Sequence, residues 1–367
     1  MATYSGTPWL AKGFTASFRF MVVSRSFGGE TRRLRGIRPG SLQLSCNDST
    51  SVKESGTVDY VGNADIGSDL LRVYLDAEFH DGTKESVALG TYLVNAPERT
   101  VDGRVSRGTL SLTGRLQELA DAQFARPLTV KAGANPVEEA ARIVGRYGLK
   151  CAYEHTDYKT GAARTYGTGG NGDESVLDAV NDLLELAGFR SARTDAYGMV
   201  HFNKYVEPTD SIPVWYFEEG ANARFLSEVT EERDMSGVAN VVRVTYSTQD
   251  KSFVGIARDD DPKSAFSTVA QGREICRTET LSDVPEKATD KQIQQLADKK
   301  AAELLRTGQS VIHRITLSTV WCPIWYHQTA RISYPSAGID GVFAIRTINT
   351  TGSPGALMEV ELRRFER

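Results

Sequence analysis

The side chains that most often carry out chemistry are thinly spread along this sequence. Its five histidines each stand alone, at His80, His155, His201, His313 and His327. There is no Gly-x-Ser-x-Gly nucleophile elbow, no His-Glu-x-x-His zinc motif and no kinase signature. Two carboxylates that hydrolyse a glycoside could still meet in space, because such pairs need not be close in sequence. The motifs therefore predict no catalytic residue and favour a protein that is not an enzyme.

Two stretches have the residue types of a metal site. Cys151 and His155 are spaced as two ligands, but no second pair accompanies them, which argues against a zinc site. Asp259, Asp260 and Asp261 are adjacent carboxylates without the spaced ligands, central glycine and terminal glutamate of an EF-hand calcium loop. A solvated turn is the preferred interpretation of that run. The sequence predicts no metal and no cofactor.

Two further stretches could bind an anion. The glycine-rich loop 167–172 precedes a predicted helix, but it lacks the ending of a P-loop and the spacing of a dinucleotide site, so a connector is favoured. The basic run 32–38 could contact phosphate or an acidic partner. A solvated hairpin between two strands is its commoner use. We keep Arg32, Arg33 and Arg35 as candidate interface residues.

Length and composition bound the class of protein. The 367 residues are enough for two or three domains, and 40% apolar with 25% charged residues is usual for a soluble globular protein. A net charge of −4 argues against a general nucleic-acid binder. We find no secretory signal and no stretch approaching the roughly 20 apolar residues of a membrane span. We expect buried, reduced thiols in a cytosolically made protein at Cys46, Cys151, Cys276 and Cys322.

A pattern of three short strands occurs twice. In each copy the second and third strands open on a glycine, at 71–76, 90–94 and 108–112 and again at 330–335, 341–345 and 355–362. Glycine-led strands are common, so chance similarity is the alternative. If the repeat is real, the chain holds two related β modules, with an insert or spacer between them.

Period-two alternation supports the first module. One face of the stretch 14–23 carries Phe14, Ala16, Phe18, Phe20 and Val22. One face of the stretch 71–79 carries Leu71, Val73, Leu75, Ala77 and Phe79, and the opposite face carries Arg72, Tyr74, Asp76 and Glu78. Burying one such apolar face is worth about 5–10 kcal/mol before conformational entropy is subtracted. Several short strands separated by turns indicate a barrel or sandwich.

Helix signals begin near residue 120. Asn135 can cap a helix that ends at Gly148, and Asp173 can cap a second that ends at Gly188. Near the C-terminus, Thr289 and Gln292 form a capping box. We therefore predict a mainly β fold with an α/β insert: two related β-barrel modules separated by a small α/β region. The predicted domains are 1–119, 120–206 and 207–367, the last with a long helix near 289–307.

Several stretches in order resemble the tail hub proteins of tailed phages and related contractile injection systems. They lie at 56–60, 66–75, 89–94, 181–184, 195–198, 257–264, 297–305 and 358–363. The resemblance implies two alike barrel domains per chain, so that three chains close a pseudo-six-fold ring that joins the six-fold tail tube to the three-fold tail tip. It carries over no catalytic residue.

The resemblance also implies partners and a location. A homotrimer with interfaces of roughly 2,000–5,000 Å² would contact the tail tube or distal tail protein, the tape measure protein and the tail tip or spike protein. We expect no membrane anchor, DNA only in passage through the lumen, a place in the tail tip or baseplate, and assembly in the host cytoplasm. Polar strand faces such as Arg72, Asp76 and Glu78 would then face the channel or a neighbouring subunit.

Two other functions stay open at this point. A carbohydrate-binding or peptidoglycan-degrading β-protein of the tail tip would use Trp321 and Trp325 as sugar platforms, although an aromatic-proline corner more often closes a barrel end. A receptor-binding tip protein would need a distal domain that the sequence does not reveal.

Overall fold

The computed structural model describes residues 9, 13–25, 28–62, 64, 66–95, 99–168, 175–221, 223–234, 238–247, 251–281, 289–308 and 311–366. The chain divides into two compact units. Unit 1 comprises residues 1–229 and 316–362, and unit 2 comprises residues 230–315 and 363–367. Among the helices of the described ranges, none combines the length and apolar character needed to cross a membrane.

The first β module opens unit 1. Its strands are β1 (Phe14–Val23), β2 (Glu30–Arg33), β3 (Gln43–Asn47), β4 (Glu54–Val61), β5 (Leu70–Phe79), β6 (Lys84–Asn95), β7 (Arg99–Asp102) and β8 (Val105–Gly114). They are ordered β3-β4-β8-β6-β5-β1-β2, with β7 also beside β8. The apolar face predicted on β5 is confirmed, since Leu71, Val73 and Leu75 are fully buried. Burial of one face is what holds this strand in register.

An α/β region follows in the chain. Its elements are α2 (Gln117–Ala120), β9 (Leu128–Val130), α3 (Pro136–Arg146), β10 (Cys151–Tyr153), β11 (Arg164–Tyr166), α4 (Val176–Leu186), β12 (Arg193–Thr194), β13 (Val200–Phe202) and η1 (Pro208–Asp210). Asn135 caps α3 as predicted, because its side chain accepts from the N–H groups of Val137 and Glu138. The helix α4 is confirmed, but the cap predicted for it is wrong: Asp173 lies outside the described residues, and Ser175 caps the helix in a capping box with Asp178.

The second β module closes unit 1. Its elements are β14 (Trp215–Glu218), β15 (Phe225–Asp234), β19 (Val311–Val320), β20 (Thr329–Tyr334), η2 (Pro335–Ala337), β21 (Ile339–Thr351) and β22 (Leu357–Glu366). They are ordered β15-β19-β22-β21-β20-β14. The two copies of the sequence repeat therefore form β5, β6 and β8 in one module and β20, β21 and β22 in the other.

The correspondence extends beyond those three strands. Taken in chain order, β1, β3, β4, β5, β6 and β8 match β14, β15, β19, β20, β21 and β22, and each set has the same neighbours in its sheet. One pairing differs in direction, because β1 is antiparallel to β5 whereas β14 is parallel to β20. The same order of six strands occurs twice in one chain, which argues that the sequence repeat is not a chance similarity. The mainly β fold with an α/β insert is confirmed, and closure of each module as a barrel stays a prediction.

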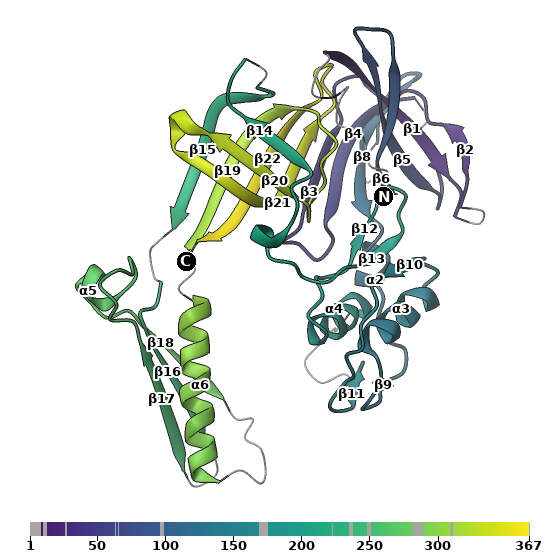
Figure 1. The fold of residues 1–367 in the computed structure, drawn as a ribbon. Coiled ribbons are helices and arrows are strands. Elements are labelled where there is room, and N and C mark those ends of the chain that lie inside the picture. The colour runs from purple at the N-terminus through teal and green to yellow at the C-terminus, as the bar shows by residue number, and fades with distance from the viewer. Residues whose placement is uncertain are drawn as a thin grey trace. The chain divides into compact units, whose positions relative to one another are not determined.

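The two modules share one continuous sheet (Figure 1). Strand β3 of the first module pairs antiparallel with β21 of the second, so that Leu44 lies opposite Thr350 and Cys46 opposite Ile348. All four side chains are buried. We call this pairing the seam.

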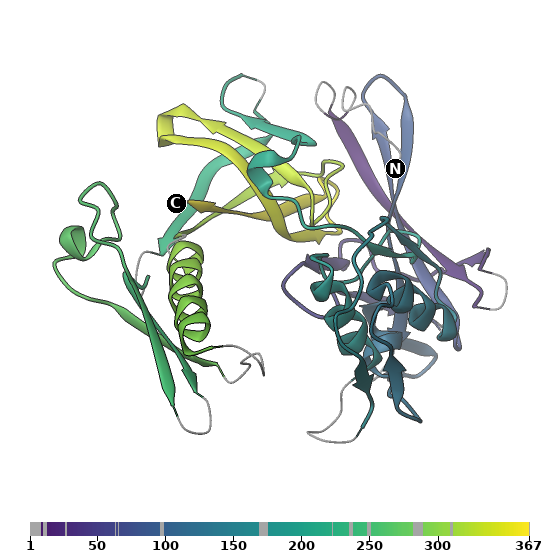
Figure 2. The same ribbon diagram turned by 60° about the horizontal axis from the view of Figure 1, so that its bottom comes forward.

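Unit 2 is a second, smaller α/β structure. It contains β16 (Val241–Ser247), β17 (Ser252–Arg258), α5 (Thr268–Gln271), β18 (Cys276–Leu281) and α6 (Asp290–Gly308), with sheet order β17-β16-β18. Helix α6 packs along β16 and β17 (Figure 2). The capping box of Thr289 and Gln292 is confirmed by reciprocal bonds of 2.8 and 3.4 Å.

Unit 2 interrupts the second module between β15 and β19. The first module has only the short segment 48–53 at the matching place, between β3 and β4. Unit 2 is therefore an insertion into one copy of a duplicated hairpin, and the sequence predicted its long helix but not that it is an insertion.

Candidate functional site

His201 and Asp195 form a hydrogen-bonded pair in the α/β region. No group of three or more His, Cys, Asp or Glu side chains in those ranges could hold a metal ion. His201 lies 3.0 Å from Asp195. Burial acts to raise the pKa of the Asp195 carboxyl, but hydrogen bonds from His201 and the Met199 N–H outweigh it and lower that pKa. These contacts position the turn at 195–199.

The three adjacent aspartates at 259–261 form a hydrogen-bonded turn. Asp259 accepts from the Ser264 hydroxyl at 2.6 Å, and Asp260 accepts from Arg258 at 2.8 Å. Asp261 accepts from the backbone N–H of Lys263 at 2.9 Å. Their oxygens are thus engaged within the turn, as the solvated-turn interpretation predicts.

Arg72 lies inside the protein. It is only 8% exposed, and its Nε donates to Thr91 at 2.9 Å while its Nη1 donates to Glu30 at 3.1 Å. The guanidinium also lies over the Tyr197 ring, 4.9 Å from its centroid. Arg72 therefore links β5 to the turn between β12 and β13, a positioning role, and within one chain it is not a surface group.

Asp76 and Glu78 follow on the same face of β5 but are progressively more exposed. Asp76 accepts from Arg19 at 2.9 and 3.1 Å and from Ser86 at 2.5 Å. Burial raises the pKa of Asp76, but the Arg19 and Ser86 hydrogen bonds prevail and the net effect lowers it. Glu78 pairs with Lys84 at 3.2 Å, and both side chains are mostly in solvent. Such an exposed pair contributes little to stability.

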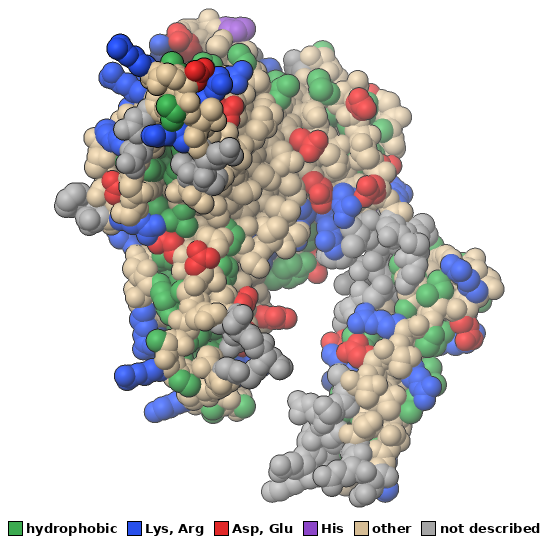
Figure 3. Space-filling view, turned by 180° about the vertical axis from the view of Figure 1, so that it is seen from behind, with side chains coloured by type: hydrophobic (Ala, Val, Ile, Leu, Met, Phe, Trp, Pro, Cys, Tyr) green, Lys and Arg blue, Asp and Glu red, His purple; other side chains and the backbone are tan. Residues whose placement is uncertain are grey.

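The basic run lies at the rim of a groove. Arg32, Arg33 and Arg35 are exposed, the first two on β2 and the third in the following loop. A cavity of about 830 Å³ opens beside this run, with Phe18 and Phe20 of β1 in its lining. Gly352 and Pro354 from the β21–β22 turn also line it. On the face shown in Figure 3, basic and acidic side chains are interspersed.

A buried polar cluster joins three parts of unit 1. Glu54 of β4 accepts from the Thr194 hydroxyl of β12 at 2.8 Å, and it also accepts from the Tyr326 hydroxyl, which precedes β20. Burial raises the pKa of Glu54 against the opposing effect of those two hydrogen bonds. Burial likewise raises the pKa of Tyr326. The cluster ties the α/β region to both β modules.

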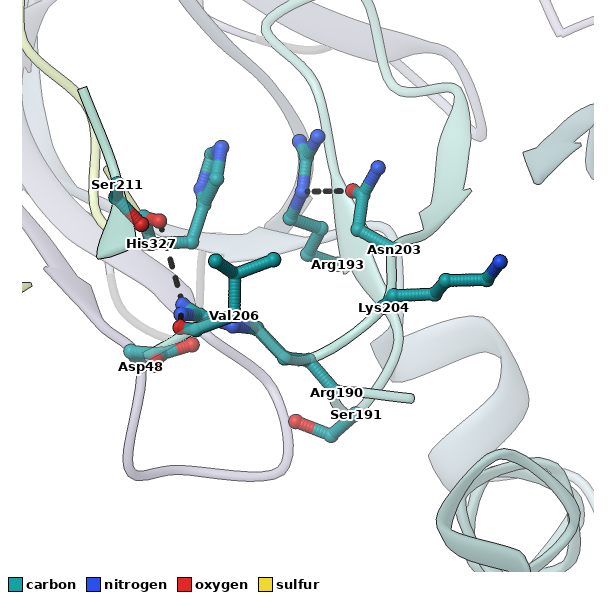
Figure 4. Close-up of a pocket in the computed structure, with 9 residues that line it drawn as sticks. All are labelled: Asp48, Arg190, Ser191, Arg193, Asn203, Lys204, Val206, Ser211 and His327. Carbon is teal, nitrogen blue, oxygen red and sulfur yellow. Dashed lines mark hydrogen bonds between the residues drawn. The ribbon is translucent and has the colours of Figure 1, made fainter. Parts of the chain in front are cut away.

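A small pocket of about 180 Å³ lies beside this cluster (Figure 4). Its lining is Asp48, Arg190, Ser191, Arg193, Asn203, Lys204, Val206, Ser211 and His327. Arg190 donates to the backbone carbonyls of His327 at 3.2 Å and Val206 at 3.1 Å. Arg193 donates to the Asn203 side chain at 3.0 Å. The two arginines thus hold the irregular segment that follows β13, and Arg190 also ties it to residue 327.

His327 adopts an unusual backbone conformation at this pocket. Its φ is +70°, in the left-handed region that non-glycine residues rarely occupy, and the Arg190 contact holds its carbonyl. Burial lowers the pKa of His327, and the nearby charges of Arg193 and Arg190 lower it further. Sequence reasoning missed this pocket and the Glu54 cluster, because their residues come from segments far apart along the chain. Single polar residues in strand ends were the only available signal.

We compared the sequence and the structure with known proteins. No family model and no curated protein matches the sequence. Among solved structures, a tail protein from Neisseria meningitidis is 14% identical, with a TM-score of 0.64 over 96% of this chain and 97% of that one. The chain has the fold of phage tail proteins. The resemblance predicted from the sequence is thereby confirmed at the level of the fold.

Two further structures share the tail-protein fold. The 43 kDa tail protein of prophage MuSo2 from Shewanella oneidensis is 9% identical, with a TM-score of 0.60 over 95% of this chain and 98% of that one. A chain of the Francisella PdpA–VgrG complex is 8% identical, with a TM-score of 0.59. That match covers 96% of this chain but 58% of the other, so the longer chain has further structure beyond the shared fold.

Proposed function

We propose that this protein is a structural tail hub, in which three copies close a pseudo-six-fold ring. The observation that carries the proposal is the duplicated order of six strands. Three chains with two similar modules each supply six similar positions around an axis, which one module per chain could not do at three-fold symmetry. The likeness to phage tail proteins over nearly the whole chain supports the same conclusion.

Such a ring would join the six-fold tail tube, or the distal tail protein, to a three-fold tip or spike. The tape measure protein would end at it, and DNA would only pass through its lumen. The protein would therefore reside in the tail tip or baseplate of a virion or a related injection apparatus, after assembly in the host cytoplasm.

The same proposal assigns no catalytic role. The competing idea of sugar platforms loses one of its two residues, because Trp321 is 3% exposed and packs against Trp9 with ring centroids 4.6 Å apart. Trp325 alone is half-buried. A glycan-binding platform needs accessible ring faces, so we propose no second function.

The organisation of the chain follows from the ring. We propose residues 1–119, 120–206 and 207–367 as first module, connecting α/β region and second module, with unit 2 inserted in the last. Of the candidate interface residues, Arg32, Arg33, Arg35 and Glu78 are the exposed ones and are proposed to face neighbouring proteins. Arg72 and Asp76 are proposed to shape the surface beside them.

Light scattering coupled to size exclusion, with negative-stain imaging, tests the ring. The expected particle has three times the 40.2 kDa chain mass and six similar lobes in projection. A monomer at all concentrations, or a two-fold dimer, would contradict the proposal. The purified full chain suffices for both measurements.

A further inference from the structure

The seam inside one chain has unpaired counterparts elsewhere on the same chain. Its two strands are β3 and β21, and by the strand correspondence β3 matches β15 while β21 matches β6. Strand β15 stands at the end of the sheet order, with β19 as its neighbour on one side only among the described strands. An end strand offers a row of N–H and C=O groups for pairing.

Strand β7 extends β6 along β8. Residues Tyr92–Asn95 of β6 pair with Gly114–Ser111 of β8, and Arg99–Asp102 of β7 pair with Gly108–Val105. Because β4 occupies the other side of β8 over 107–113, β6 and β7 lie on the same side. Together β6 and β7 correspond to the single long strand β21 of the second module. In β21 the residues 347–351 just before the turn pair with β3, whereas all four residues of β7 are exposed.

The turn after β21 also makes hydrogen bonds to the first module. The Gly352 N–H donates to the Leu42 carbonyl at 2.7 Å, and the Ala16 N–H donates to the Pro354 carbonyl at 3.1 Å. The end of the β21–β22 hairpin therefore lies between β1 and the segment that leads into β3. The matching hairpin end, between β7 and β8, is the two-residue turn at Gly103.

Exposure separates the two sets of edges. In the seam, Leu42, Leu44 and Ile348 are 3%, 6% and 6% exposed. On the matching unpaired edges, Val101 of β7 and Leu226 of β15 are 56% and 58% exposed. Large apolar side chains thus lie uncovered at the positions where the other copy of the module has its covered seam.

From this we infer that the β7–β8 hairpin of one copy pairs edge to edge with β15 of the next copy, antiparallel, as β21 pairs with β3 within the chain. The partner is a second copy of this protein. Strand β15 lacks a neighbour of the kind that β21 gives to β3, and β7 of the same sequence is the exposed counterpart of that part of β21. The inference rests on the proposed ring and names its contact. The contact is head-to-tail, so it can close a ring and cannot make an isologous dimer.

The unit-1 half of β15, Phe225–Val229, is the part that matches β3 in length. On it the Ser227 carbonyl already accepts from the Tyr334 hydroxyl at 3.0 Å. Strand β14 runs opposite to its counterpart β1, so the hairpin end is not expected to repeat the Ala16 bond. The pairing of β7 with β15 is the part that the seam predicts.

The β7–β8 hairpin also defines which groups point outward. With Asp102 opposite Val105 across a two-residue turn, that pair and the Thr100–Arg107 pair exchange hydrogen bonds, while Val101 directs its N–H and C=O away from β8. Val101 would then bond to β15. Thr100 would lie in a non-hydrogen-bonded pair with β15, where side chains come closest and a disulfide fits.

Cross-linking two different proteins, each with one introduced exposed cysteine, tests the contact. In a Cys276→Ser background, which removes the exposed native thiol, Thr100→Cys protein is mixed with protein carrying Leu226→Cys, Ser227→Cys or Glu228→Cys and oxidised. We expect a covalent dimer for at least one of the three mixtures and none from either protein alone. Ile256→Cys, at 62% exposure on the edge strand β17 of unit 2, is the matched control and should not cross-link to Thr100→Cys.

A second pair of variants separates backbone pairing from apolar contact. Val101→Pro removes the outward N–H, which an edge strand tolerates, and should reduce assembled protein at least tenfold while the β-sheet circular dichroism stays that of wild type. Val101→Thr keeps the N–H and should assemble nearly as wild type. Equal assembly of the proline variant and wild type would overturn the inference.

The outcomes also separate this contact from the ring itself. A three-copy particle in which none of the mixtures cross-links overturns the pairing of β7 with β15 and leaves the ring standing. A mixed cross-link in a particle of some other copy number supports the pairing and overturns the three-copy ring. Absence of both overturns both.

Discussion

Cys46 lies directly opposite Ile348 across the seam, so one buried thiol marks the place where the two β modules of the chain become one sheet. Burial raises the pKa of the Cys46 thiol, and Glu54 adds to the effect. A thiol that stays protonated and enclosed is inert toward alkylating reagents.

The four free cysteines should therefore react in order of exposure. Cys276 is exposed and should be modified first, whereas Cys46 and Cys322 are buried and should react only after unfolding. Burial raises the pKa of half-buried Cys151 to about 12, so it should react slowly. Mass spectrometry of native protein pulsed with iodoacetamide measures this. The expectation that all four are buried is wrong for Cys276, which lies on β18 of unit 2.

Glu54→Gln should make stability less dependent on pH. Because burial raises the pKa of Glu54 in the folded state, its contribution is fully present below the unfolded value and is lost as pH rises through the folded one. The glutamine keeps an oxygen for the Tyr326 and Thr194 hydroxyls and cannot ionise. Urea unfolding between pH 4.5 and neutrality should show wild type losing stability relative to the variant. Parallel curves would contradict the assignment.

Gly255→Ala should loosen unit 2. A Cβ at Gly255 would lie 2.2 Å from the carbonyl carbon of Ala297, so α6 must move away from β17. Overpacking of this kind costs about 1–3 kcal/mol of unfolding free energy. The matched control is Gly145→Ala in α3, where the added Cβ meets open space and should stabilise by up to about 1 kcal/mol. Thermal unfolding of the two variants should move in opposite directions.

Arg72→Met should weaken the fold without changing assembly. The substitution leaves Glu30 without its 3.1 Å partner and Thr91 without its 2.9 Å donor, at a cost of about 1–3 kcal/mol. Because Arg72 is buried within one chain, the particle mass should equal that of wild type. A variant that is a stable monomer would instead show that Arg72 contributes to the contact between copies.

The part of unit 2 between β15 and β19 should be removable. Replacing residues 235–310 by a short polar turn would join β15 to β19 in the way that 48–53 joins β3 to β4. We expect the shortened chain to retain its β-sheet circular dichroism and the same copy number. Loss of folding would show that the insertion supports the strands that carry it.

The sequence predicted elements best where one face is buried. Alternation over 71–79 and the Asn135 and Thr289 caps were enough to place β5, α3 and α6, because those signals are local. The Asp173 cap failed since Ser175, two residues later, offers a hydroxyl and a partner in Asp178. Local patterns rank such neighbours poorly.

The contacts among elements were harder to foresee. Arg72 has the alternation of a solvent-facing residue, yet a turn from the α/β region covers it. The Glu54 cluster needs residues from three segments, and no spacing rule connects them. By contrast, the three-strand repeat located both modules, because duplication leaves the same hydrophobic pattern twice.

The opposite course of β14 relative to β1 gives the two modules unlike rims. A parallel pair offers slanted, evenly spaced bonds, while an antiparallel pair alternates narrow and wide ones. A protein whose hydrogen bonds match the edge of one module would not match those of the other. In the proposed ring the six modules would therefore fall into two alternating sets of three with different edges. A partner with three-fold symmetry could then bind one set and not the other.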